Sequence, residues 1–346
     1  MGILTSDSNY FGLDIGTTAV RLVQLKKLPG IQPSLVTYGD VPLPHELMMS
    51  DSQIDEDKIA QIIAGLVRDT KVTTKEVVAG LASSQAFATV ITTPKLSPAD
   101  LSRAMKLQAE QYIPMAIDSA KVDWQILGPG KNDQEMQVLL VAAPNSAVNK
   151  ILNIIQKAGL ELSALELNAV AVTRSLMPNL DIAVIILDVG SSTTDITIVH
   201  QQAPKLIRSV NVGGMTFQRS VEQSLGLESD QATQFLHNFG LTKTKLEGQV
   251  LKAVKPSLDS LTDEIDRSIK FFASQNEGVK LEKVILTGGT SRLPELQSYI
   301  ANATQLPVEM GNSWVGVSYP ASLQDKLMSI SLDYSVAIGL AQRSFV

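Results

Sequence analysis

The sequence predicts an α/β protein built from two related halves, with a small subdomain inserted in the first half. Three observations predict this class. A short acidic turn motif occurs twice, half a chain apart, each copy lies between strand-like segments, and helical segments follow each copy. Strands and helices that alternate along a chain are typical of α/β layers. The 346 residues are enough for two domains of about 150 residues each.

Composition and charge exclude several classes of function. The 29 basic and 35 acidic side chains give a net charge of −6, which argues against a dedicated nucleic-acid binder. The absence of cysteine excludes disulfides, thiolate catalysis and Cys-ligated metals, and the three histidines are too scattered to predict a His-rich metal site. No stretch approaches the roughly 18 apolar residues of a membrane helix, and the charged start of a secretory signal is missing. We therefore expect a soluble, cytoplasmic protein.

The repeated motif reads LDIGTT at Leu13–Thr18 and LDVGSS at Leu187–Ser192, with the two copies 174 residues apart. An apolar run precedes each copy. Apolar residues then alternate with polar ones, from Val20 to Leu25 after the first copy and from Ile196 to Val199 after the second. Period-2 alternation is typical of a half-buried strand. Each copy is therefore predicted to be a hairpin of strand, Asp-x-Gly turn and strand.

Apolar spacing predicts the other elements of the two halves. Helices are expected from Ile54 to Asp69 and from Ala147 to Ala158, each with one apolar face. A stripe with spacings of three and four residues predicts a further helix around Leu258 to Phe272. Val284 to Leu286 is predicted as a short buried strand, and Asp333 to Ala341 as a last helix packed on the core.

The segment 86–143 has a different pattern and is predicted to be a compact insertion. Phe87 to Thr93 is strand-like, and Ser97-Pro98 then supplies an N-cap and a proline at the first position of a helix. Val122 to Leu127 and Met136 to Ala142 are strand-like and are separated by a turn-rich stretch. The predicted order is β-α-β-β.

The acidic turns have the chemistry of a phosphate grip. A glycine lets the backbone approach a ligand, and successive N–H groups and hydroxyls can donate to phosphate oxygens. Asp14 and Asp188 would repel phosphate, but each can hold Mg²⁺ through water, because this hard cation prefers oxygen ligands. One Asp-x-Gly is a common turn sequence. Two copies in equivalent strand contexts favour a clamp that holds a polyphosphate from both sides.

A third feature, Thr287 to Ser291, places two glycines between a buried strand and a helix, where a ribose or a flat ring could lie on the backbone. By itself such a Gly-Gly pair is only a loop. Together with the two hairpins it resembles the actin-like ATPase superfamily, over nearly the whole chain. Within it, the chain is similar to the FtsA/PilM branch and to the PilM family of type IV pilus assembly proteins, through the β-α-β-β insertion and through Ile113-Pro114, Asp123, Leu140 to Ala143, Val212 to Gly214 and Tyr334 to Ala341.

The resemblance implies a two-lobed actin-like ATPase fold with duplicated core subdomains. It assigns residues 1–85, 144–177 and 333–346 to lobe I, or subdomain 1A. Residues 86–143 become a 1C-type insertion, and residues 178–332 become lobe II, with subdomains 2A and 2B and with 2B at about 225–280.

The resemblance also implies the site residues. Mg²⁺ would be held by Asp14 and Asp188. ATP would be bound by Gly16, Thr17, Thr18, Asp188, Gly190, Ser191, Ser192, Thr193, Gly213, Gly214, Glu264, Arg267, Ser268, Gly288, Gly289 and Arg292. Glu264, Arg267 and Ser268 share one helix face, and a solvated face with an ordinary ion pair is the alternative. Hydrolysing relatives orient the attacking water with a Gln or Glu, for which Glu166 and Asn168 are the candidates here, and ATP binding with slow or no hydrolysis is expected.

The implied function is that of an ATP-binding cytoplasmic component of the type IV pilus inner-membrane assembly platform. The implied partner is the N-terminal cytoplasmic tail of PilN, bound in a groove beside the insertion, which would recruit the protein to the inner face of the cytoplasmic membrane. The resemblance also allows contacts with the cytoplasmic pilus motor ATPases and self-association, without nucleic acid or direct membrane insertion. An FtsA-like filament-forming scaffold and a small-molecule kinase on the same fold are the alternatives.

Overall fold

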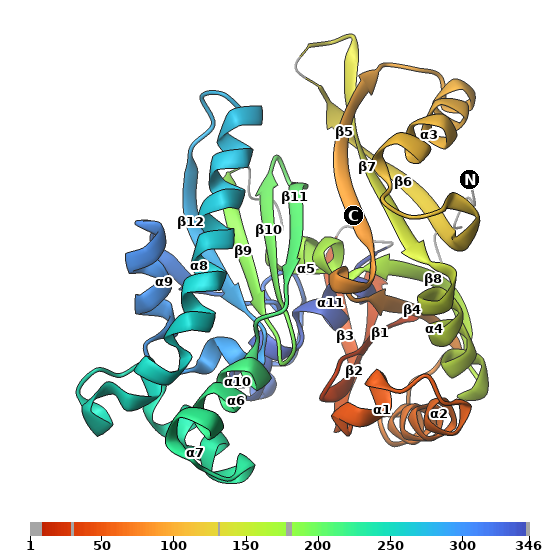
Figure 1. Ribbon diagram of the computed structural model, residues 1–346. Helices are drawn as coiled ribbons and strands as arrows, with labels where there is room; N and C mark the ends of the chain where they lie inside the picture. The colour runs from red at the N-terminus through yellow and green to blue at the C-terminus, as the bar shows by residue number, and fades with distance from the viewer. Residues whose placement is uncertain (1–8, 29–30, 131, 178–181, 344–346) are drawn as a thin grey trace.

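The computed structural model describes residues 9–28, 31–130, 132–177 and 182–343. These residues form two five-stranded sheets, ordered β3-β2-β1-β4-β8 and β11-β10-β9-β12-β13, and a three-stranded sheet ordered β5-β7-β6. The five-stranded sheets share one plan, because each has three antiparallel strands followed by two parallel ones. The predicted duplication is therefore confirmed, and Figure 1 shows the two sheets side by side in separate lobes.

Lobe I, as we use the name below, contains the first sheet. Its strands are β1 (Phe11–Ile15), β2 (Ala19–Leu28), β3 (Ile31–Pro42), β4 (Glu76–Leu81) and β8 (Glu161–Leu167), and its helices are α1 (His45–Met49), α2 (Gln53–Asp69), α4 (Asn145–Lys157), α5 (Asn168–Leu176) and α11 (Ser335–Ala341). The apolar faces predicted for α2 and α4 are buried, with Ile59 and Ile63 packed beside Ile151 and Ile155 in one core. The predicted helices therefore begin and end within two residues of the observed ones.

Lobe II contains the second sheet. Its strands are β9 (Ala183–Val189), β10 (Thr194–His200), β11 (Ala203–Val210), β12 (Leu281–Thr287) and β13 (Val308–Met310), and its helices are α6 (Gly214–Leu225), α7 (Ser229–Phe239), α8 (Gln249–Gln275), α9 (Leu296–Thr304) and α10 (Gln324–Ile330). The predicted stripe of α8 is its buried face, where Leu258, Leu261, Ile265 and Phe272 join the core of this lobe. Amphipathic spacing thus decided which side of this long helix faces the sheet.

The insertion has the predicted β-α-β-β order, with β5 (Phe87–Pro94), α3 (Pro98–Tyr112), β6 (Ala120–Pro129) and β7 (Glu135–Pro144). The Ser97 side chain caps α3 by accepting a hydrogen bond from the Asp100 N–H. In Figure 1 this sheet stands at one end of lobe I, with β5 next to β11 of lobe II. The two are in contact, because Ile207 of β11 packs in a cluster with Leu139 of β7.

The last helix, α11, lies in the middle of the molecule and packs against α5 and β1. The sequence predicts this helix from residue 333, whereas residues 331–333 form a 3₁₀ turn and α11 begins at Ser335. Every residue of α11 is buried, and the added Cβ of an alanine at Gly339 would overlap the backbone carbonyl of Ala171 in α5. Among the described residues, no helix is long and apolar enough to cross a membrane.

Candidate functional site

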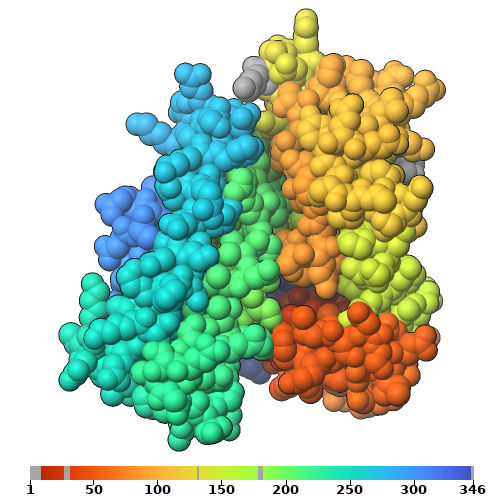
Figure 2. All heavy atoms as spheres, in the orientation of Figure 1, coloured from red at the N-terminus to blue at the C-terminus, as the bar shows by residue number. Residues whose placement is uncertain are grey.

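The tips of the two repeated hairpins meet between the lobes. The Thr17 hydroxyl of the β1–β2 turn donates a hydrogen bond of 3.3 Å to the Ser191 hydroxyl of the β9–β10 turn, and the Ser192 hydroxyl lies 3.5 Å from Thr17. The space-filling view shows an open notch between the lower ends of the two lobes, with the green helices of lobe II on one side and the red helices of lobe I on the other (Figure 2). The structure therefore brings together two turns that are 174 residues apart in the sequence.

Both turns are closed in the same way. The Gly16 N–H donates to the Ala19 carbonyl at 3.0 Å, and the Gly190 N–H donates to the Thr193 carbonyl at 2.9 Å. A glycine at each of these positions avoids a side chain, since an added Cβ would lie 2.9 Å and 3.0 Å, respectively, from those carbonyl oxygens. The duplication thus extends from strand order to the hydrogen bonding of the two turns.

The two predicted metal-binding aspartates lie where the strands reach these turns, with Asp14 buried and Asp188 partly buried. Burial raises the pKa of Asp14 to about 6, against the opposing effect of Arg21. Burial also raises the pKa of Asp188 to about 8, and the negative charges of Asp195, Asp14 and Asp333 raise it further, while Arg21 lowers it. Two carboxylates that repel each other are the kind of group that a bound cation stabilises.

These carboxylates fit Mg²⁺ better than a metal held by protein ligands alone. Among the described residues, no group of three or more His, Asp or Glu side chains is placed to hold a metal ion. Mg²⁺ commonly takes one or two carboxylates and completes its six ligands with water and phosphate oxygens. Asp14 and Asp188 match that chemistry.

Three charged residues of this site were not identified from the sequence. Arg21 lies directly across from Asp14 in the β1–β2 pair, and Asp195 lies across from Asp188 in the β9–β10 pair. The Arg21 guanidinium is 3.8 Å from the Asp14 carboxylate and 3.7 Å from that of Asp333. Arg21 and Asp195 could have been found from the sequence, because each stands seven residues after the aspartate of its motif. Asp333 could not, since only folding brings it to the hairpins.

The predicted adenosine motif lies against the second hairpin. Gly288 follows β12 with φ of 84°, and an added Cβ there would overlap the Asp188 carboxylate. At Gly289 an added Cβ would lie 3.0 Å from the Asp333 carboxylate. Arg292 pairs with that same carboxylate at 2.7 Å. The two glycines therefore let this loop pack closely on the second hairpin and on Asp333, and its contact with a nucleoside stays a prediction.

The α8 residues predicted to contact ATP form an ion-pair network. The Glu264 carboxylate pairs with Arg208 of β11 and, at 2.6 Å, with Arg267. Ser268 is fully buried, and its hydroxyl donates to the Glu264 carbonyl at 2.8 Å. None of the hydrogen bonds found among the described residues joins this network to the hairpin tips. A direct role in ATP binding stays a prediction for these three residues.

The two candidates for orienting water differ in their partners. Arg174 donates to both Glu166 carboxylate oxygens, at 2.8 Å and 2.7 Å. Asn168 is the first residue of α5, and its buried side-chain oxygen has no hydrogen-bond partner among the described residues. Asn168 therefore keeps an open acceptor, whereas the Glu166 carboxylate is already bound in a bidentate ion pair.

Comparison with known proteins identifies the family. The model of the family described as "Type IV pilus assembly protein PilM" matches residues 12–345. The chain belongs to the PilM family. A solved PilM–PilN type IV pilus biogenesis complex is 26% identical, with a TM-score of 0.85, over 98% of this chain and 99% of that chain.

More distant relatives place this PilM-family chain among proteins with the actin-like ATPase fold. MreB5 of Spiroplasma citri, solved bound to AMPPNP, has a TM-score of 0.55 at 13% identity and covers 96% of this chain and 95% of its own. The cell division protein FtsA of Neisseria meningitidis is 22% identical over 86% of this chain and 82% of its own. The predicted fold class and the predicted family are both confirmed.

Proposed function

We propose that this PilM-family protein binds Mg-ATP between its two hairpins and docks the N-terminal cytoplasmic tail of a PilN-type membrane protein beside its insertion. The observation that carries the nucleotide half is the meeting of two like-built turns, with an aspartate at the base of each, Asp14 buried and Asp188 partly buried. The partner half is supported by the solved PilM–PilN complex, at 26% identity over 98% of this chain. Such a tail would hold the protein at the inner face of the cytoplasmic membrane.

Each hairpin residue has a role in this proposal. Asp14 and Asp188 would hold the metal through its water ligands, and the backbone N–H groups and hydroxyls of Gly16–Thr18 and Gly190–Thr193 would bind phosphate oxygens. The metal would supply charge neutralisation of the phosphates. Arg21, paired with Asp14 and Asp333, adds a positive charge beside this site. The bidentate pairing of Glu166 with Arg174 supports slow or no hydrolysis.

Mg-ATP should stabilise the protein, and Asp14→Ala should abolish most of this stabilisation. A ligand at a hundredfold its Kd adds about 2.7 kcal/mol to the free energy of unfolding. Differential scanning fluorimetry with and without Mg-ATP measures the shift in Tm. Asp69→Ala is the matched control, because Asp69 is exposed at the end of α2 and, among the described residues, forms an ion pair only with its neighbour Arg68. A wild-type protein with an unchanged Tm in Mg-ATP would refute the nucleotide proposal.

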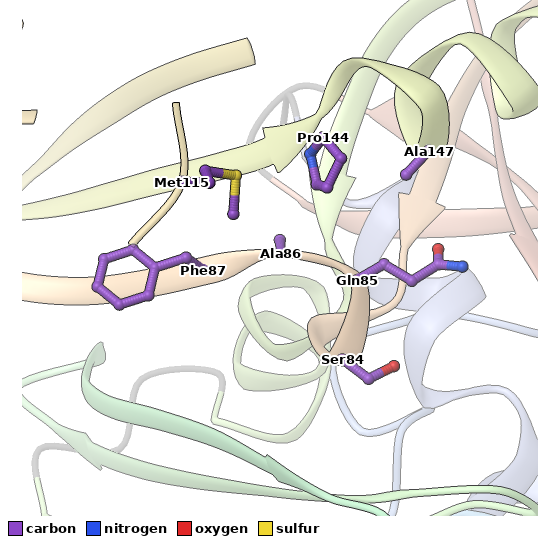
Figure 3. Close-up of a pocket in the computed structure, with 7 residues that line it drawn as sticks. All are labelled: Ser84, Gln85, Ala86, Phe87, Met115, Pro144 and Ala147. Carbon is purple, nitrogen blue, oxygen red and sulfur yellow. The ribbon is translucent and has the colours of Figure 1, made fainter. Parts of the chain in front are cut away.

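A pocket of about 420 Å³ at the junction of the insertion and lobe I is the proposed docking site for the tail. Figure 3 shows Phe87 and Met115 on the insertion side and Pro144 and Ala147 on the side of α4, with its lining completed by Ser84, Gln85 and Ala86. The lining is mostly apolar, and pockets of this kind hold apolar anchor side chains with a few polar groups that set orientation. The pocket therefore suits an apolar side chain of an extended peptide.

Met115→Arg should weaken binding of a PilN N-terminal peptide by at least about tenfold, because the new charge would be desolvated in the pocket. Fluorescence anisotropy with a labelled synthetic peptide measures the affinity. Met328→Arg is the matched control, since Met328 lies on α10 of the other lobe and is already partly exposed. Equal peptide affinities for the Met115→Arg variant and the wild type would exclude this pocket as the docking site.

A further inference from the structure

The β9–β10 turn, which we call the second phosphate turn, accepts hydrogen bonds from two other segments of lobe II. The Gly190 carbonyl oxygen accepts a hydrogen bond of 3.1 Å from the Gly214 N–H and one of 2.8 Å from the Thr290 hydroxyl. The next carbonyl, that of Ser191, accepts one of 2.8 Å from the Met215 N–H. A carbonyl oxygen has two lone pairs, so that of Gly190 is fully used. Three segments of lobe II meet at this one oxygen.

This bracing sets the direction of the neighbouring N–H groups. No peptide bond between described residues is cis, and in a trans peptide the carbonyl and the following N–H point in opposite directions. Because the Gly190 and Ser191 carbonyls are held toward α6 and the Thr290 loop, the N–H groups of Ser191 and Ser192 face the other way. Successive N–H groups that point to one side form an anion-binding concavity.

Gly213 and Gly214, which are predicted to contact the nucleotide, also allow α6 to pack closely against the second phosphate turn. An added Cβ at Gly213 would lie 2.6 Å from the Ser191 carbonyl oxygen and 2.7 Å from that of Gly190. At Gly214 an added Cβ would lie 2.8 Å from the Thr290 hydroxyl oxygen. Without side chains at these positions, the first turn of α6 can approach the phosphate turn closely enough to donate its N–H groups to it.

We infer that Thr290 is a positioning residue for the nucleotide, one that holds the Gly190–Ser191 peptide in the orientation in which the N–H groups face the phosphates. This inference rests on the proposed nucleotide site. Thr290 belongs to the loop implied to hold the nucleoside, and its hydroxyl is the single side-chain group that hydrogen-bonds the Gly190 carbonyl among the described residues. The hydroxyl therefore connects the nucleoside side of the site to its phosphate side.

The test compares Thr290→Val, which removes the hydroxyl and keeps the shape, with Thr290→Ser, which keeps the hydroxyl. A net hydrogen bond corresponds to an affinity change of about three- to tenfold, so Thr290→Val should weaken Mg-ATP binding by that factor. Thr290→Ser should bind Mg-ATP within about twofold of wild type, and both variants should bind adenosine as the wild type does. Isothermal titration with Mg-ATP and with adenosine measures both affinities.

A second variant keeps the inference falsifiable if Thr290→Val folds poorly. Gly214→Ala should displace the Thr290 hydroxyl and weaken Mg-ATP binding by a similar factor. The double variant Gly214→Ala/Thr290→Val should bind Mg-ATP no more weakly than the weaker-binding single variant, because both substitutions act on one hydrogen bond. Additive losses, an unchanged affinity of Thr290→Val for Mg-ATP, or equal losses for adenosine and ATP would each overturn the inference while leaving the nucleotide site in place. A wild-type protein that does not bind Mg-ATP would overturn both.

Discussion

Asp188→Asn should make the nucleotide-free protein more stable at pH 8. The pKa of about 8 in the folded state lies above the ordinary value of 3.8 for an aspartate, so the folded state binds this proton more tightly than the unfolded state does. The stability contributed by the group is then present at low pH and is lost as pH rises from about 4 to about 8. Asparagine has no such charge to bury. Its advantage over aspartate should grow by on the order of 3–4 kcal/mol between pH 5 and pH 8, measured by urea unfolding.

The same substitution should remove the stabilisation by Mg-ATP, because the amide cannot replace a carboxylate toward Mg²⁺. We expect at least about a tenfold loss of Mg-ATP affinity, because the neutral amide loses the charge-assisted hydrogen bonds that the carboxylate would make to the water ligands of Mg²⁺. Asp57→Asn, on the exposed side of α2, is the matched control for both measurements. The interpretation of the site would be wrong if Asp188→Asn had the same pH dependence as the wild type and still bound Mg-ATP.

Gly339→Ala should destabilise the fold by about 3 kcal/mol or more. The added methyl group would overlap the Ala171 carbonyl, and a contact with backbone in a fully packed region cannot be relieved by a side-chain rotation. The free energy of unfolding from urea denaturation gives the size of the effect. Gly65→Ala is the matched control in a helix, because an added Cβ there meets only the flexible end of Arg68 at 3.8 Å.

The two glycine variants should have effects of opposite sign. Gly65→Ala should stabilise the protein by about 0.5–1 kcal/mol, since alanine loses less conformational entropy in a helix than glycine does. Similar effects of the two substitutions would contradict the close packing of α11 against α5. This packing matters for the site because α11 also contacts β1, the strand that carries Asp14.

Local patterns were enough to predict most of the fold. The Asp-x-Gly turns and the alternation that follows Asp14 and Asp188 predict both hairpins, because a turn and a half-buried strand depend on neighbours a few residues away. The Ser97-Pro98 start likewise predicts α3. Even the meeting of the two turns could be proposed, from the equivalence of the two copies.

Contacts between residues far apart in the chain were decided only by the tertiary structure. Helical spacing places Glu264 on the same face as Arg267, but it does not show that Arg208, 56 residues earlier, pairs with the same carboxylate. Nor does it show that Thr290 hydrogen-bonds a carbonyl 100 residues before it. The sequence by itself determined the turns and strands that carry the aspartates, because these depend on short-range backbone preferences. Which charges, hydroxyls and glycines surround the aspartates was decided only by tertiary packing, because a contact between residues far apart in the chain produces no periodic pattern in the sequence.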